Sequence, residues 1–187
     1  GSRPIDADFL ALPRHELADA ALSAAMQAGA SYADLRIHRI ATEALRLRDG
    51  ELETAVADEE IGLAVRVIVD GAWGFASHSE LSTASAAETA RRAVKVSTTL
   101  AALNDERIEL APEPVYHDVS WVSDYLIDPS DVATKVKVAV LADYSGRLLS
   151  SDGVDHVAAC LDTAKEQTFY ADTFGSSITQ QRVRVLP

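Results

Sequence analysis

Apolar and polar residues alternate along much of the first half of the chain, as expected for strands that bury one face. The alternation covers residues 32–41 and returns in residues 45–77, where Asp49-Gly50 and Asp70-Gly71 each separate two alternating runs. Asp and Gly tolerate the positive φ angles that a two-residue type I′ turn requires. The pattern therefore predicts an antiparallel meander of four or five strands.

The first predicted turn determines which charged residues face each other across its strands. A turn at Asp49-Gly50 places Arg48 opposite Glu51 and Arg46 opposite Glu53. Both are pairs of opposite charge, which favour one register over its alternatives. We therefore expect these two pairs to set the register of the first hairpin.

The second turn divides its hairpin into two chemically different faces. One face carries small side chains and suits a closely packed helix; it consists of Val65, Val67, Val69, Ala72, Gly74 and Ala76. The other face is large and apolar and is edged by an arginine; it consists of Arg66, Ile68, Trp73 and Phe75. Two interpretations of the large face remain open: a layer of ordinary core, or a surface that meets another domain, a partner or a peptide.

Two alanine-rich helices are predicted from apolar residues that recur at three- and four-residue spacing. The first spans about residues 15–28 and ends before Gly29, a natural helix stop. The second spans about residues 85–103, and Ser85 and Glu88 have the spacing of a capping box at its start. Their small side chains predict close packing on a sheet.

A third helix is predicted after an extended segment. Residues 112–128 lack a helical period and predict a crossing segment with a short strand. Asp128 is then the expected N-cap, with Pro129 in the first turn. The helix should end between residues 146 and 152, and its expected buried face consists of Val132, Val136, Ala139 and Val140.

The last part of the chain returns to strand patterns. Residues 157–161, 168–171 and 178–186 alternate, with a turn in residues 172–176. Aligning Gly175 with Gly50 places a helix before both units, which indicates a possible duplicated helix-plus-strands unit. Residues 183–186 lack an assigned partner, so the natural chain continues or this run pairs back within the sheet. The fold class is thus α+β, an antiparallel meander packed with about three helices.

Composition narrows the function classes. The 187 residues are 48% hydrophobic with a net charge of −12 and no apolar run of membrane-spanning length, and the start of the chain does not resemble a signal peptide. Basic residues are scattered rather than massed on one face, which argues against nucleic-acid binding. The single Cys160 fits a reducing cytosol and a strand position rather than a nucleophile. Gly1-Ser2 is the expected remnant of a cloning site.

No catalytic or metal motif is complete in this chain. His15-Glu16-Leu17-Ala18-Asp19 begins like the H-E-x-x-H helix of zinc peptidases, but Asp stands where the second histidine is needed. The five histidines lie far apart in sequence; they are His15, His38, His78, His117 and His156. We therefore predict no catalytic residue and no metal site within this chain.

Several ordered segments resemble the N-terminal domain of the TldD/PmbA family. They are residues 33–36, 48–53, 62–67 and 70–77, the helix that follows, and the turn at 174–176 with Gln180. The sequence Gly-Ala-Trp-Gly-Phe-Ala at residues 71–76 favours the TldD-like branch over the PmbA-like (TldE) branch. The resemblance covers nearly the whole chain.

The resemblance implies a cytoplasmic zinc metallopeptidase that acts on peptides and unfolded segments, often as a TldD–TldE dimer. The zinc helix of the family lies in a C-terminal half that these residues do not include, so no catalytic residue is carried over. We expect residues 3–187 to be a single N-terminal domain, inactive alone, that frames the active-site cleft. Its expected contacts with substrate or with the C-terminal domain are Arg66, Ile68, Trp73, Gly74 and Phe75.

The expected partners are that C-terminal domain, a TldE/PmbA-like subunit or a second copy, and a peptide substrate. Direct contact with nucleic acid or membrane is not expected, and zinc is expected only in the intact enzyme. Three alternatives remain: a non-catalytic PmbA/TldE-like subunit, a free-standing binding module, and a gyrase-modulating protein, the last following an older description of the family.

Overall fold

A computed structural model gives the fold and describes residues 3–103 and 106–187. Gly1-Ser2, the expected cloning remnant, lies outside the described residues. The described elements are, in chain order, α1 (Ala7–Leu10), α2 (Arg14–Gln27), β1 (Tyr32–Arg48), β2 (Glu51–Val69), β3 (Ala72–His78), α3 (Thr83–Ala101), β4 (Val119–Val122), the 3-10 turn η1 (Pro129–Asp131), α4 (Thr134–Leu149), β5 (Ala158–Asp172) and β6 (Ser177–Leu186).

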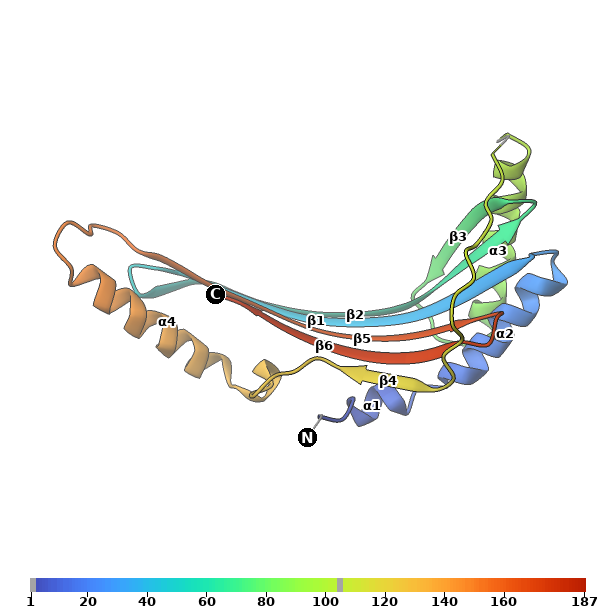
Figure 1. The fold of residues 1–187 in the computed structure, drawn as a ribbon. Helices are drawn as coiled ribbons and strands as arrows, with labels where there is room; N and C mark the ends of the chain where they lie inside the picture. Colours follow the sequence, from blue (N-terminus) through green and yellow to red (C-terminus); the bar gives the residue numbers. More distant parts are fainter. Residues whose placement is uncertain (1–2, 104–105) are drawn as a thin grey trace.

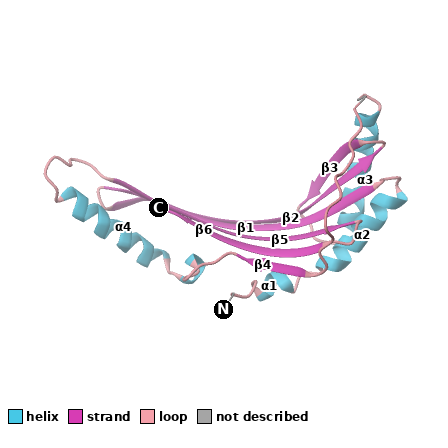
Figure 2. Ribbon diagram, in the orientation of Figure 1, coloured by secondary structure: helices cyan, strands magenta, loops and turns pink. Residues whose placement is uncertain are grey.

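Across the described residues, six strands form one curved sheet in the order β3-β2-β1-β5-β6-β4 (Figure 1). Neighbouring strands are antiparallel except β4 and β6, which are parallel. Helices α1, α2 and α4 lie along the convex side, and α3 packs behind β2 and β3 at the upturned end (Figure 2). The α+β class is confirmed, and so is the short strand predicted between the second and third helices.

Both Asp-Gly turns are present with the expected backbone conformation. The φ angles are 51° and 86° at Asp49-Gly50, and 47° and 73° at Asp70-Gly71. The second hairpin also has the predicted register, because Ile68 lies opposite Trp73 and Arg66 opposite Phe75. The dipeptides therefore place the two chain reversals correctly.

The first hairpin departs from the predicted register at one point. Arg48 faces Glu51 as expected, but the register shifts between Arg46 and Leu47, so that Arg46 faces Thr54 instead of Glu53. Its guanidinium instead donates to Asp162 of β5 at 2.8 and 3.0 Å. The prediction was wrong because a cross-strand partner from distant sequence satisfies this arginine.

The meander has fewer and longer strands than predicted. β1 is continuous over 17 residues and β2 over 19, so the first part of the chain contributes three strands rather than four or five. Glu43 interrupts the apolar alternation of β1, yet its carboxylate accepts hydrogen bonds from Lys137 and Thr134 of α4. β1 therefore continues through Glu43, where the apolar pattern is interrupted, because α4 supplies polar partners for this side chain.

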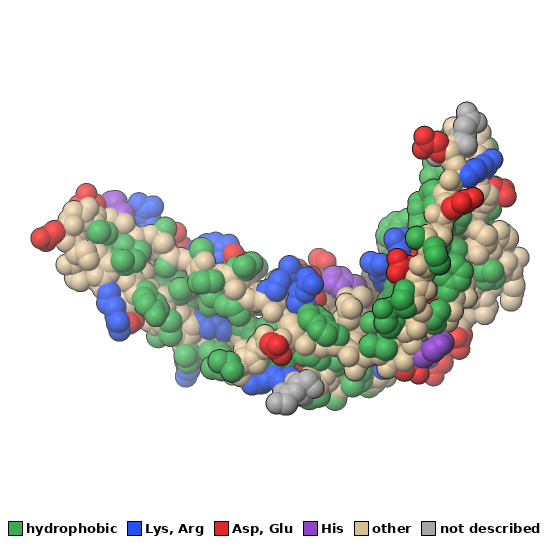
Figure 3. Space-filling view, viewed as in Figure 1, with side chains coloured by type: hydrophobic (Ala, Val, Ile, Leu, Met, Phe, Trp, Pro, Cys, Tyr) green, Lys and Arg blue, Asp and Glu red, His purple; other side chains and the backbone are tan. Residues whose placement is uncertain are grey.

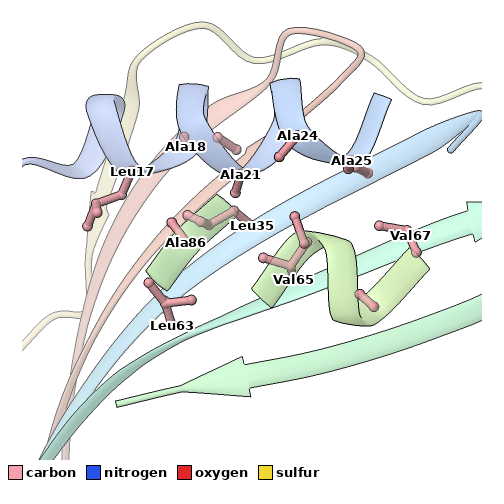
Figure 4. Close-up of a cluster of buried hydrophobic side chains, with 14 of the residues drawn as sticks. Leu17, Ala18, Ala21, Ala24, Ala25, Leu35, Leu63, Val65, Val67 and Ala86 are labelled. Carbon is pink, nitrogen blue, oxygen red and sulfur yellow. The ribbon is translucent and has the colours of Figure 1, made fainter. Parts of the chain in front are cut away.

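The main core lies between the sheet and the two alanine-rich helices (Figure 4). Sheet residues such as Leu35 and Val65 meet alanines of α2 and α3, including Ala21 and Ala90, and all of these are fully buried. Small side chains on the helices allow close approach to the sheet, as the sequence predicts. The small-residue face of the second hairpin therefore packs inward.

The start of α3 differs from the prediction. The N-cap is Ser82, and Ser82 and Ser85 hydrogen bond reciprocally to each other's backbone N–H. The predicted box of Ser85 with Glu88 does not form, since Glu88 lies near Arg91 at 3.4 Å. Ser85, three residues after the N-cap, accepts the hydrogen bond from the N-cap backbone, the role that the prediction gave to Glu88.

The third predicted helix is divided, and its buried face was assigned wrongly. Asp128 caps the η1 turn, and α4 begins only at Thr134. Its buried residues are Lys137, Leu141 and Ser145, whereas Val136 and Val140 are 47% and 50% exposed and Ala139 is exposed. Because Lys137 reaches Glu43 and Leu141 packs on Leu45 and Leu47, the side of α4 that carries Val136 and Val140 faces solvent.

A polar cluster occupies the middle of the convex side, between α2 and α4. Lys165 of β5 donates to Asp6 at 2.8 Å and to Asp128 at 2.7 Å. Gln167 donates to Asp6 and to Gln181 of β6, each at 2.9 Å. The cluster therefore fastens the start of the chain, and the segment before α4, to two neighbouring strands.

The end of the chain pairs back within the sheet. Residues 183–186 of β6 lie opposite residues 162–165 of β5, and the alternating runs predicted before them merge into the single strand β5. The order α4-β5-β6 repeats the order α2-β1-β2, with a glycine turn in each hairpin. Within residues 3–103 and 106–187, no helix has both the length and the apolar character needed to cross a membrane.

Candidate functional site

The concave face of the sheet is the candidate site. Strand alternation directs the large residues of the second hairpin to this face, while the helices pack on the other. Trp73 and Phe75 of β3 lie at its upturned end, and Phe75 is 56% exposed. An exposed aromatic side chain on an uncovered sheet face is typical of a contact surface.

A buried carboxylate organises the aromatic end of this face. Asp34 of β1 is 1% exposed and accepts hydrogen bonds from Arg66, from Nε at 3.0 Å and from Nη2 at 2.7 Å. The hydrogen bond to Asp34 raises the pKa of Arg66, although burial opposes the shift. The guanidinium also lies over the Trp73 ring, 5.0 Å from its centroid. Arg66 is therefore held in place and fixes the indole beside it.

Two tyrosines extend this arrangement along the face. The Tyr32 hydroxyl lies 3.1 Å from Asp34 and 3.0 Å from the Tyr170 hydroxyl, which donates to Asp172 at 2.9 Å. Burial raises the pKa of Tyr32 to about 12 and also raises the pKa of Tyr170. Both phenols therefore stay protonated at neutral pH, and they act as hydrogen-bond donors rather than as bases.

The five residues expected to contact substrate or another domain do not form one surface. Arg66, Trp73 and Phe75 share the concave face; Ile68 lies opposite Trp73 on the same face but is only 4% exposed. Gly74 faces the opposite way: a Cβ there would lie 2.1 Å from the Ala93 carbonyl oxygen of α3. The large face is thus part core, through Ile68, and part open surface, through Phe75.

A hollow of about 990 Å³ occupies the middle of the concave face. Its lining comes from all six strands of the sheet and the segment after β3, and includes Arg36, His38, Glu60, Trp121, Gln180 and Arg182. Figure 3 shows basic, acidic and histidine side chains along the concave edge of the molecule. Sequence reasoning missed this hollow, because only the alternation of Arg36 and His38 with buried neighbours hinted at it.

The hollow offers charged and hydrogen-bonding groups but no metal site. Within the described part of the chain, no three His, Cys, Asp or Glu side chains are arranged to hold a metal ion. His15, the start of the incomplete zinc motif, packs its ring edge-on against Phe169 at 5.2 Å. Zinc therefore does not fit these residues. Cys160 is exposed on the sheet, opposite Arg46, as a plain sheet-face position.

A family model described as PmbA/TldA metallopeptidase domain 1 matches residues 33–97. These residues cover β1, β2, β3 and most of α3, which together hold Asp34, Arg66 and Trp73. No curated protein sequence matches the chain. The sequence match therefore includes the aromatic end of the concave face.

Solved structures share the fold at low sequence identity. A candidate modulator of DNA gyrase from Thermotoga maritima has a TM-score of 0.69 and 16% identity, covering 91% of this chain and 38% of its own. A similar candidate modulator from Bacteroides thetaiotaomicron has a TM-score of 0.68 and 15% identity, covering 91% and 39%. TldE from Thermococcus kodakarensis has a TM-score of 0.63 and 13% identity, covering 88% and 36%.

The chain thus spans less than two fifths of the length of these relatives. Its fold corresponds to one part of each of them, and the sequence match lies within that part. Residues 33–97 match the model of the first domain of the PmbA/TldD family.

Proposed function

We propose that the chain is the N-terminal domain of a cytoplasmic, TldD-like zinc metallopeptidase, and that its concave face borders the cleft in which peptides are cleaved. The proposal is supported by two observations together: the match to a metallopeptidase-family domain model, and a sheet with one face left open. That face presents Trp73, Phe75 and a polar hollow, while the chain's own helices cover the other.

In this proposal the domain binds and orients a peptide but does not cleave it. The concave face supplies rigid aromatic side chains and charged groups, held by contacts such as that of Arg66 with Asp34. Zinc in the intact enzyme would polarise the peptide carbonyl and activate water. Since the described residues do not fit a zinc site, no hydrolytic step is assigned to them.

A second candidate function is that of a non-catalytic, TldE-like partner subunit. The similarity to TldE from Thermococcus kodakarensis favours it, because the same fold occurs in that protein. The two candidates differ in the sequence that follows, since only a catalytic chain would carry a zinc helix of the H-E-x-x-x-H type. A third candidate, gyrase binding, follows the names of the other two relatives.

The test compares the full-length protein with the 187-residue chain, side by side. We expect the full-length protein to contain zinc and to hydrolyse unfolded peptides in a chelator-sensitive way, and the 187-residue chain to do neither. Chelator-sensitive hydrolysis by the 187-residue chain alone would overturn the proposal. A full-length protein without zinc or activity, which gains activity only on mixing with a second subunit, would favour the partner role.

A further inference from the structure

The arginines of the concave face divide into two groups. Most are neutralised by carboxylates of neighbouring strands at 2.7 or 2.8 Å, in the pairs Arg66–Asp34, Arg46–Asp162 and Arg184–Glu166. Arg36 and Arg182 line the central hollow and form no ion pair among the described residues. Glu166 lies directly opposite Arg182 across β5 and β6, but its carboxylate is paired with Arg184. The hollow is therefore where unpaired guanidinium groups gather on this face.

The two unpaired arginines lie at opposite ends of a polar floor. His38, Thr168 and Gln180 sit side by side across β1, β5 and β6. Arg36 lies two residues before His38, and Arg182 two residues after Gln180, at diagonal corners. Strand spacing and rise put their Cα atoms about 17 Å apart, so two long side chains can reach one segment lying across the floor.

The floor and its arginines are available to a ligand. The side chains of Thr168 and Gln180 make no hydrogen bond within the described residues. Arg36 is positioned over the Tyr170 ring, 5.5 Å from its centroid, which orients its guanidinium without neutralising it. On the other flank, Glu60 lines the hollow from β2. The unpaired carboxylate of the lining thus lies on the β2 side, whereas Glu166 on the β6 side is paired with Arg184 and leaves Arg182 unpaired.

We infer that this hollow binds an extended acidic peptide segment, with its carboxylates held by Arg36 and Arg182. A guanidinium binds a carboxylate through two parallel charge-assisted hydrogen bonds, which makes arginine selective for such groups. The inference rests on the proposed function, because it names the class of peptide that the concave face takes. A nucleic acid fits less well, because Glu60 and a net charge of −12 oppose a polyanion.

The test uses the full-length protein and a matched set of short fluorescent Gly/Ser/Ala peptides. One peptide carries two Glu residues, a second carries two Gln residues instead, and each is made with a free and with an amidated C-terminus. We expect the Glu peptide to bind about tenfold more tightly than the Gln peptide, the effect of a charge-assisted hydrogen bond. A preference for the free C-terminus instead would identify the terminal carboxylate as the group held.

The variant R182Q separates the hollow from general electrostatics. The Arg182 side chain makes no hydrogen bond or ion pair within the described residues, so its replacement should leave the fold unchanged. We expect R182Q to lose most of the preference for Glu while binding the Gln peptide as before. The control R92Q removes the same charge from the exposed surface of α3 and should keep the preference.

Three results would overturn the inference: equal binding of the peptides in both terminal forms, equal effects of R182Q and R92Q, or stronger competition by a single-stranded oligonucleotide. Hydrolysis of the Gln peptide reports separately on the proposed function. If that peptide is cleaved without any preference for carboxylates, the acidic-peptide inference alone fails. If no peptide is bound or cleaved, the proposed function fails with it.

Discussion

Gly74 lies where β3 passes directly under α3, and a methyl group has no room there. A Cβ at this position would lie 2.1 Å from the Ala93 carbonyl oxygen and 2.6 Å from the Cβ of Ser97. Both distances are far below van der Waals contact, and the nearest atom belongs to backbone. Gly74→Ala therefore requires α3 to move away from the sheet.

That movement would also disturb two buried hydrogen bonds. The Ser97 hydroxyl donates to the Ala72 carbonyl at 2.6 Å and accepts from the Val69 N–H at 3.0 Å. Overpacking costs about 1–3 kcal/mol, and each weakened hydrogen bond adds about 1 kcal/mol. We expect Gly74→Ala to lower the free energy of unfolding by about 3 kcal/mol, which lowers Tm by about 10 °C in a domain of this size.

Urea and thermal unfolding of the 187-residue chain measure this effect, with Gly146→Ala as the matched control. Gly146 lies within α4, and a Cβ there meets no atom within 4 Å. Because alanine favours a helix over glycine, the control should gain about 1 kcal/mol. A Gly74→Ala protein within about 0.5 kcal/mol of the unsubstituted chain would refute the packing of α3 on β3, since that is the scatter of neutral substitutions.

Two further predictions concern charged groups. Asp34→Asn should lower the free energy of unfolding, measured in urea, by about 2 kcal/mol, because it weakens the buried partner of the half-exposed Arg66. Asp162→Asn removes a charge from an exposed pair and should lower it by less than about 1 kcal/mol. Equal losses in the two variants would contradict this prediction. Although burial opposes it, hydrogen bonding from Lys165 holds the pKa of Asp128 below its usual 3.8. Its contribution is therefore present above pH 3.8 and lost as pH falls further, and Lys165→Met should flatten that acid limb of the urea midpoint; an unchanged slope would contradict the assignment.

Local chemistry allowed several features to be predicted from sequence. Asp49-Gly50 and Asp70-Gly71 place their turns because few residue pairs tolerate positive φ at two successive positions. Alternation after Asp70-Gly71 also predicted which side chains share a face with Trp73. These signals succeed because each depends on residues only a few positions apart.

Features that depend on distant residues could not be predicted in this way. Arg46 pairs with Asp162, which lies more than a hundred positions away in the sequence. Neither the turn residues nor the apolar pattern indicates the bulge next to Arg46. The face of α4 was misjudged because a lysine points inward to reach Glu43, against the usual preference for exposed lysine. The hollow joins Arg36 to Arg182 only because β1, β5 and β6 are neighbours in the sheet.

In the proposed function, the concave face, and not the convex one, meets the peptide or the rest of the enzyme. Site-specific photo-cross-linking in the full-length protein tests it directly, with a photoreactive residue in place of Phe75 on the concave face or of Met26 on α2. Both positions are exposed, at 56% and 44%. We expect cross-links from position 75, to an added unfolded peptide or to residues after 187, and none from position 26. Cross-links from position 26 alone would contradict it.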